Sequence, residues 1–202
     1  MVAYCGVELQ MSQISDLVRS EFCEAKRLLR DKLMFQTRDL VPMESWRLQD
    51  DLDLEDFGGS WLSHPGNDAF PKDSDLALFR QIQGNTKLQT MFLTTAEGGG
   101  VALCPHAIAI YESQAQDFLK CVLVLCNVSS GPPLREPELL SVMWRNKARQ
   151  RHLMIWEKLV MIHTQYHKGQ QKSGVYKDNI RFLPKAIGDL LLSYITYVLP
   201  LR

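Results

Sequence analysis

The amino-acid sequence predicts an α+β protein, in which a mostly helical N-terminal region precedes a three-stranded antiparallel sheet and a closing helix. Apolar residues recur at helical spacing over Ser12–Leu33 and again over Ser113–Val128. Two short β-favouring runs then follow each other closely, at His152–Trp156 and Leu159–Tyr166, which is typical of a hairpin. Helices that precede the strands, rather than alternate with them, indicate the α+β class.

Length and composition fit a globular protein. The chain has 202 residues, of which 46% are apolar and 23% charged, so it can bury a core and is not disordered throughout. Its longest strongly apolar run, Leu119–Val128, is too short to span a bilayer, and the N-terminus carries no secretory pattern. We therefore expect an intracellular protein without a membrane partner. The five cysteines are odd in number and irregularly spaced, so we expect free thiols.

The N-terminal region is expected to hold two helices separated by a long irregular segment. A serine near the start of the first helix, Ser12–Leu33, can cap it, and its apolar stripe faces the core. Prolines and glycine pairs make residues 36–73 irregular. The acidic run Gln49–Asp56 is expected to be a solvated loop, because it lacks the glycine and glutamate of a calcium loop. A second helix covers Ser74–Leu93, and three glycines at 98–100 then break the chain.

The C-terminal elements start with a strongly apolar helix. Ser113–Val128 is apolar nearly all round, so we expect it inside a domain rather than on its surface. A Gly-Pro-Pro stop follows, and a proline suited to the first turn begins the next helix, Pro137–Asn146. Beyond it we expect three strands and an amphipathic helix: His152–Trp156, Leu159–Tyr166, Val175–Leu183 and Lys185–Leu199.

The formal net charge of zero conceals two parts of opposite sign. Residues 1–131 carry 11 basic and 18 acidic side chains, and residues 132–202 carry 12 basic and 5 acidic ones. A basic C-terminal part suggests an anionic partner, of which nucleic acid is the usual one. The alternative is that the basic part contacts the acidic part of the same chain.

The residue spacing argues against a metal site and against common hydrolase chemistry. His163 and His167 are four residues apart, but in a strand this spacing spans about 13 Å, too far for two ligands of one zinc ion. The nucleophile elbow Gly-x-Ser-x-Gly does not occur. We therefore expect neither a metal nor a cofactor.

Three basic residues are candidates for contact with a phosphate or with DNA. Arg135 opens a helix after a Gly-Pro turn, Lys168 ends the central strand, and Arg181 lies on the returning strand. A planar arginine fork suits a phosphate, and a lysine at a hairpin tip can reach into a DNA groove. For Arg135 alone the alternative is a structural role or a helix-end salt bridge, but the ordered combination is more specific than its parts.

The same residues resemble part of the catalytic domain of tyrosine recombinases. The run GPPLREPELLSVMW at 131–144 is similar to the first catalytic box of that family. Tyr166-His167-Lys168-Gly169, followed by Arg181-Phe-Leu-Pro184, is similar to its lysine-bearing hairpin. The likeness is closest to fungal Crypton-like recombinase domains, including those beside or fused to RecQ-type helicases. It implies a partial catalytic domain at 111–202, preceded at 1–110 by a helical region where the family has its DNA-clamping domain.

The resemblance implies a role for each matching residue. Arg135 would bind the scissile phosphate and stabilise charge on its oxygens. Lys168 would be the general acid that protonates the leaving 5′ oxygen. Glu138 would support the arginine-bearing turn, and His167 and Arg181 would contact phosphate or hold the hairpin.

The resemblance covers only half of the family's active site. A second arginine with a nearby histidine, and the nucleophilic tyrosine, lie beyond the closing helix in the family. Tyr194 and Tyr197 fall within that helix and are expected to be core or interface residues. We therefore expect a truncated or degenerate recombinase-like protein of mobile-element origin that binds double-stranded DNA in the nucleus. Complete strand exchange would need a protein partner that supplies the missing half. The alternatives are a non-catalytic helical protein-interaction module and a gene fragment without function.

Overall fold

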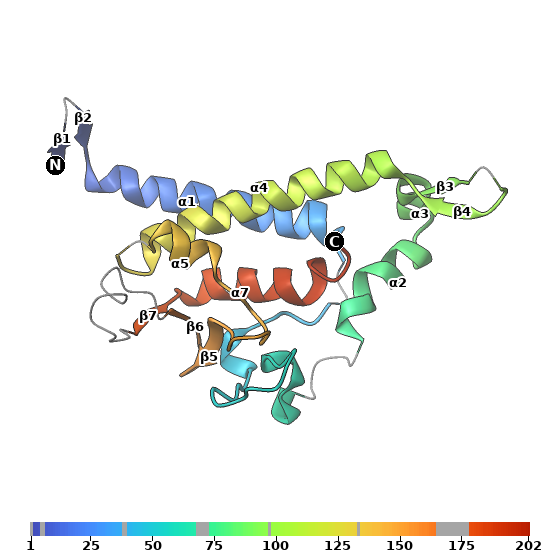
Figure 1. The fold of residues 1–202 in the computed structure, drawn as a ribbon. Coiled ribbons are helices and arrows are strands. Elements are labelled where there is room, and N and C mark those ends of the chain that lie inside the picture. The colour runs from blue at the N-terminus through green and yellow to red at the C-terminus, as the bar shows by residue number, and fades with distance from the viewer. Residues whose placement is uncertain are drawn as a thin grey trace.

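A computed structural model describes residues 2–4, 7–37, 40–67, 73–96, 98–132, 134–164 and 178–202. Two long helices, α1 and α4, lie side by side along one surface, and helix α7 packs beneath them (Figure 1). A three-stranded antiparallel sheet, in the order β5-β6-β7, packs on α7. The predicted α+β class and the three-stranded antiparallel sheet are therefore confirmed.

The first long helix matches its prediction except at its start. It comprises α1, Met11–Arg27, and a π-helical turn, Leu28–Leu33, and a short hairpin of β1, Val2–Tyr4, and β2, Val7–Leu9, precedes it. The expected serine cap is wrong, because α1 begins after Gln10. The backbone N–H of Gln10 donates to the side chain of Gln13 at 2.8 Å, which holds the first turn.

Helix α4, Pro105–Ser129, is longer and more exposed than expected. One side packs inward, where Phe118 stacks on Tyr194 with 5.0 Å between the ring centroids. On the other side, Leu123 is exposed. The expectation that this helix lies inside a domain is wrong, because no described element covers its outer face (Figure 1).

One cluster of buried side chains forms the core. It includes Leu33 and Trp61 from the N-terminal part and Leu125 and Val160 from the C-terminal part. The boundary expected between residues 110 and 111 falls within α4, and the cluster contains residues from both sides of it.

Residues 74–103 form more elements than predicted. The helix expected over Ser74–Leu93 is broken at Asn85, whose side chain accepts hydrogen bonds from the backbone N–H groups of Lys87 and Leu88 and so caps a new helix. The glycines at 98–100 lie between two short strands that the prediction missed. The observed elements are a 3-10 turn, Ser74–Leu76, helices α2, Ala77–Gly84, and α3, Thr86–Phe92, and strands β3, Leu93–Thr95, and β4, Val101–Leu103.

The predicted C-terminal hairpin is confirmed. Strands β5, Leu153–Trp156, and β6, Leu159–Thr164, are antiparallel, and β7, Asn179–Phe182, pairs with the other edge of β6. Glu157 and Lys158 make the tight turn between β5 and β6, with φ angles of 48° and 67° that suit a two-residue hairpin. The polar turn expected over 169–174 lies outside the described residues.

The closing helix lies close against the sheet. It comprises α7, Lys185–Ser193, and a π-helical turn, Tyr194–Val198, as predicted. A Cβ atom at Gly188 would lie 2.8 Å from Cγ2 of Val160 on β6, so only glycine permits this approach without a shift. The sheet is thereby fixed against the helical layer.

The helix expected over Pro137–Asn146 is wrong in its length. Helix α5 covers Glu136–Leu140 only. The chain then becomes irregular, and the carbonyl oxygen of Met143 accepts hydrogen bonds from the backbone N–H groups of His152 and Leu153 at the start of β5. These bonds take the place of a continued helix.

The acidic loop at 49–56 packs against the basic segment at 145–151, so the expectation of a fully solvated acidic loop is wrong. Arg151 Nη2 donates to Asp50 Oδ1 at 2.6 Å, and both side chains are completely buried. The second carboxylate oxygen of Asp50 accepts from the backbone N–H of Ile155 at 2.9 Å. These contacts fix the loop at the edge of β5.

Candidate nucleic-acid interface

A buried carboxylate holds the turn that carries Arg135. Arg135 directly precedes α5, and its backbone N–H donates to Glu138 Oε2 at 2.9 Å. Glu138 is 3% exposed, so its charge depends on such partners. Gly131 has a φ of 100°, a conformation that favours glycine, where the chain leaves α4. The backbone that carries the Arg135 side chain is therefore fixed.

Arg181 holds the same turn from the sheet. Its side chain is buried, and its Nε donates to the carbonyl oxygen of Pro132 at 2.7 Å. This contact joins β7 to the segment that leads into α5. The structure thus brings Arg135, Glu138 and Arg181 together around one turn, although they are up to 46 residues apart in the sequence.

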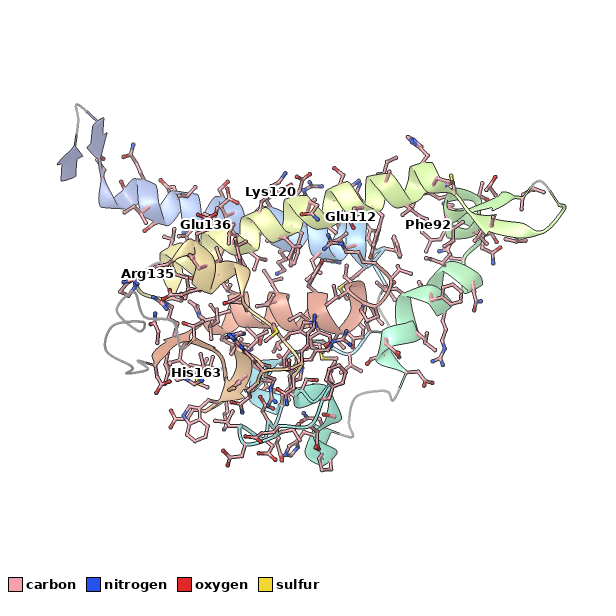
Figure 2. All side chains as sticks on the ribbon, in the orientation of Figure 1. Phe92, Glu112, Lys120, Arg135, Glu136 and His163 are labelled. Carbon is pink, nitrogen blue, oxygen red and sulfur yellow. The ribbon has the colours of Figure 1, made fainter. Side chains whose placement is uncertain are left out.

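The Arg135 side chain is exposed at one end of the molecule. Figure 2 shows Arg135 and Glu136 at the same end as His163, far from Phe92 at the other. An exposed guanidinium on a fixed backbone can form two parallel hydrogen bonds to a phosphate.

The other two predicted site residues, His167 and Lys168, lie outside the described residues. His163 lies near the end of β6, and Asp178 lies one residue before β7. Nε2 of His163 is 2.9 Å from Oδ1 of Asp178. This pair ties the ends of the two strands together.

The tyrosines of the closing helix are buried, as expected. Tyr197 donates its hydroxyl hydrogen to the carbonyl oxygen of Val41 at 2.7 Å, and burial raises its pKa to about 12. Tyr194 accepts a hydrogen bond from Arg202 on its hydroxyl oxygen, and burial raises its pKa as well. A high pKa and an inward position suit structural phenols rather than nucleophiles.

Several basic side chains of the C-terminal part form ion pairs within the chain. The Arg151–Asp50 and Arg202–Glu112 ion pairs join the basic part to the acidic part, and Lys185 pairs with Asp189. Arg151 is buried, which the charge pattern of the sequence does not indicate. Besides Lys185 and Arg202, which are paired, the exposed basic residues of the described C-terminal part are Arg135, Arg145, Lys147, Arg149 and Lys158.

His152 is partly buried where the segment after α5 meets β5. Its Nδ1 accepts a hydrogen bond from the backbone N–H of Met143 at 3.1 Å. Burial, with smaller effects from His163 and Arg149, lowers the pKa of His152 below its ordinary value of 6.5. The folded protein therefore favours neutral His152, and this contribution to stability is present above pH 6.5 and lost as the pH falls towards the lowered value.

We expect the free energy of unfolding to decrease as the pH falls below 6.5, and His152→Asn to weaken this dependence. Asparagine offers an oxygen near the position of Nδ1, so it can accept the Met143 N–H without titrating. Urea unfolding over a pH series measures both chains. An equally steep decrease in His152→Asn would show that other groups cause it.

Comparison with known proteins returns no match: no family model, curated protein or solved structure matches this chain. Within the described residues, no helix is long and apolar enough to cross a membrane.

Proposed function

We propose that this chain binds duplex DNA through a basic surface centred on Arg135, as a recombinase-derived protein that lacks complete strand exchange. The observation that carries the proposal is that Glu138 accepts from the backbone N–H of Arg135 and Arg181 donates to the carbonyl oxygen of Pro132, while the Arg135 side chain remains exposed. The sequence resemblance to the first recombinase box supports it. A nuclear location would follow from this function.

Further exposed basic side chains between α5 and β5 favour the same partner. Arg145, Lys147 and Arg149 lie on the segment between α5 and β5, and Arg145 stacks on Trp144 at 5.3 Å from the ring centroid. Several such residues supply the sequence-independent attraction to phosphates on which most DNA binding depends. With Lys168 from the predicted hairpin, they would extend the surface beyond one arginine.

Arg135→Ala and Lys168→Ala are each expected to weaken binding to a labelled duplex. Each lost phosphate contact should reduce the slope of log affinity against log salt concentration by about 1. Lys87→Ala is the matched control, because this exposed lysine lies on α3 at the other end of the molecule. Equal slopes in all four proteins, or no binding at low salt by the folded chain, would contradict the proposal.

Glu138 is expected to act on DNA binding through the position of Arg135. Glu138→Ala removes the acceptor of a buried hydrogen bond, which should cost about 1–3 kcal/mol of stability and weaken duplex binding. Glu138→Gln retains an acceptor oxygen, so it should recover much of the affinity. Binding and urea unfolding of both variants test this. Equal affinity in wild type and Glu138→Ala would exclude the positioning role.

The second candidate, a non-catalytic interaction module, also has an observation in its favour. The ion pairs Asp50–Arg151 and Glu112–Arg202 join the oppositely charged parts of the chain, so part of the basic charge needs no external partner. A soluble, folded chain that does not bind DNA at low salt would favour this function.

A further inference from the structure

A groove lies on the outer face of the sheet, away from α7. Residues directly opposite one another in antiparallel strands share a face, so the register places Met154, Met161 and Phe182 in one row and His163 and Ile180 in the next. The groove over them has a volume of about 590 Å³. Pockets that bind small ligands span roughly 300–1,000 Å³, so several side chains of a partner would fit here.

The floor of this groove is apolar: Met154 and Met161 are buried, and three further side chains are open to solvent. Trp156 is 47% exposed, Ile180 is 53% exposed and Phe182 is 39% exposed. Single exposed apolar residues are common, but a contiguous group on one sheet face marks an interaction surface. Aromatic residues are also enriched in the centres of protein interfaces.

The rim of the groove is acidic. Asp53 and Glu55 line it from the loop beside β5, and both are exposed. Within the described part of the chain, neither side chain takes part in an ion pair or hydrogen bond. The other titratable group that lines the groove is His163, which is already paired with Asp178.

Contacts within the chain fix the backbone of the acidic rim. The carbonyl oxygen of Leu52 accepts from the side-chain amide of Gln150, and that of Leu54 accepts from Asn146 at 2.6 Å. The buried Asp50–Arg151 pair anchors the start of the same loop. The carboxylates of Asp53 and Glu55 therefore lie beside the apolar floor, on a backbone that these contacts fix in place.

We infer that this groove docks a segment of a partner protein that carries lysine or arginine together with aromatic or aliphatic side chains. The apolar side chains would cover the sheet face, and the cations would pair with Asp53 and Glu55. Nucleic acid does not fit this site, because the two carboxylates repel phosphates. The groove is thus a second surface, and none of the described basic residues proposed to contact DNA lines it.

Selection from a displayed library of short random peptides tests this inference on the full chain. The wild type should enrich peptides that combine basic and apolar residues. The variant Asp53→Asn/Glu55→Gln should lose the preference for peptides with basic residues. Ile180→Thr should lower the affinity for the selected peptides by about tenfold. The matched controls, Asp56→Asn and Phe57→Thr, change an exposed carboxylate and an exposed aromatic of the same loop that do not line the groove, and should leave binding unchanged.

Three results would overturn the inference: no enrichment, enriched peptides without basic residues, or displacement of the peptides by single-stranded DNA. Equal effects of the control and groove variants would do the same. Duplex binding by Asp53→Asn/Glu55→Gln should be no weaker than that of the wild type, because the change removes negative charge beside the basic segment at 145–151. The DNA proposal depends instead on Arg135→Ala, so the two can fail separately.

Discussion

Arg151→Met is expected to lower the free energy of unfolding by about 3–5 kcal/mol. The guanidinium is completely buried and donates to Asp50, to the backbone of Asp51 and to the side chain of Asn146. Its removal would leave the Asp50 carboxylate buried without its countercharge. Urea unfolding followed by circular dichroism measures the loss.

The double variant Asp50→Leu/Arg151→Met should be less destabilised than the sum of the two single changes, because it buries no unpaired charge. Arg80→Ala is the control: the Arg80–Asp73 ion pair is exposed, so its loss should cost no more than about 1 kcal/mol. If Arg151→Met cost no more than Arg80→Ala, the buried pair would not stabilise the loop against the sheet.

Trp61→Ala is expected to lower the free energy of unfolding by about 3–5 kcal/mol. Trp61 is 0% exposed, packs on Trp144 with 5.9 Å between ring centroids, and lies in a segment that has little regular structure. Its loss would leave a large cavity between the irregular segment and the C-terminal part of the chain.

Trp46→Ala provides the matched control for this change. Trp46 lies in the same irregular segment but is half exposed, so its removal should cost far less. Thermal and urea unfolding of both variants measure the two losses in stability. Similar losses would show that Trp61 does not anchor the segment to the core.

The sequence predicted elements well where the pattern was local. Helical spacing identified α1 and the closing helix, and two β-favouring runs around Glu157-Lys158 identified the hairpin. These features depend on residues a few positions apart, so the sequence contains the information needed. The missed hairpin of β3 and β4 is short, and its strands have only three residues each, too few to show an alternating pattern.

Long-range contacts were responsible for the errors. The helix expected over Pro137–Asn146 stops early because Met143 bonds to the start of β5. The acidic loop was expected in solvent, yet Asp50 is buried because Arg151, far along the chain, supplies the countercharge. Neither outcome has a local signal, since each depends on a partner brought close only by folding.

The candidate site shows the same division. From the sequence alone came the class of fold, the opposite charge of the two parts, and the choice of Arg135, Glu138 and Arg181. Only the tertiary structure decided that Glu138 and Arg181 turn inward to hold one turn while Arg135 remains exposed. The physical reason is that residue type sets what a side chain can bind, whereas burial and the partners supplied by distant segments set what it does bind.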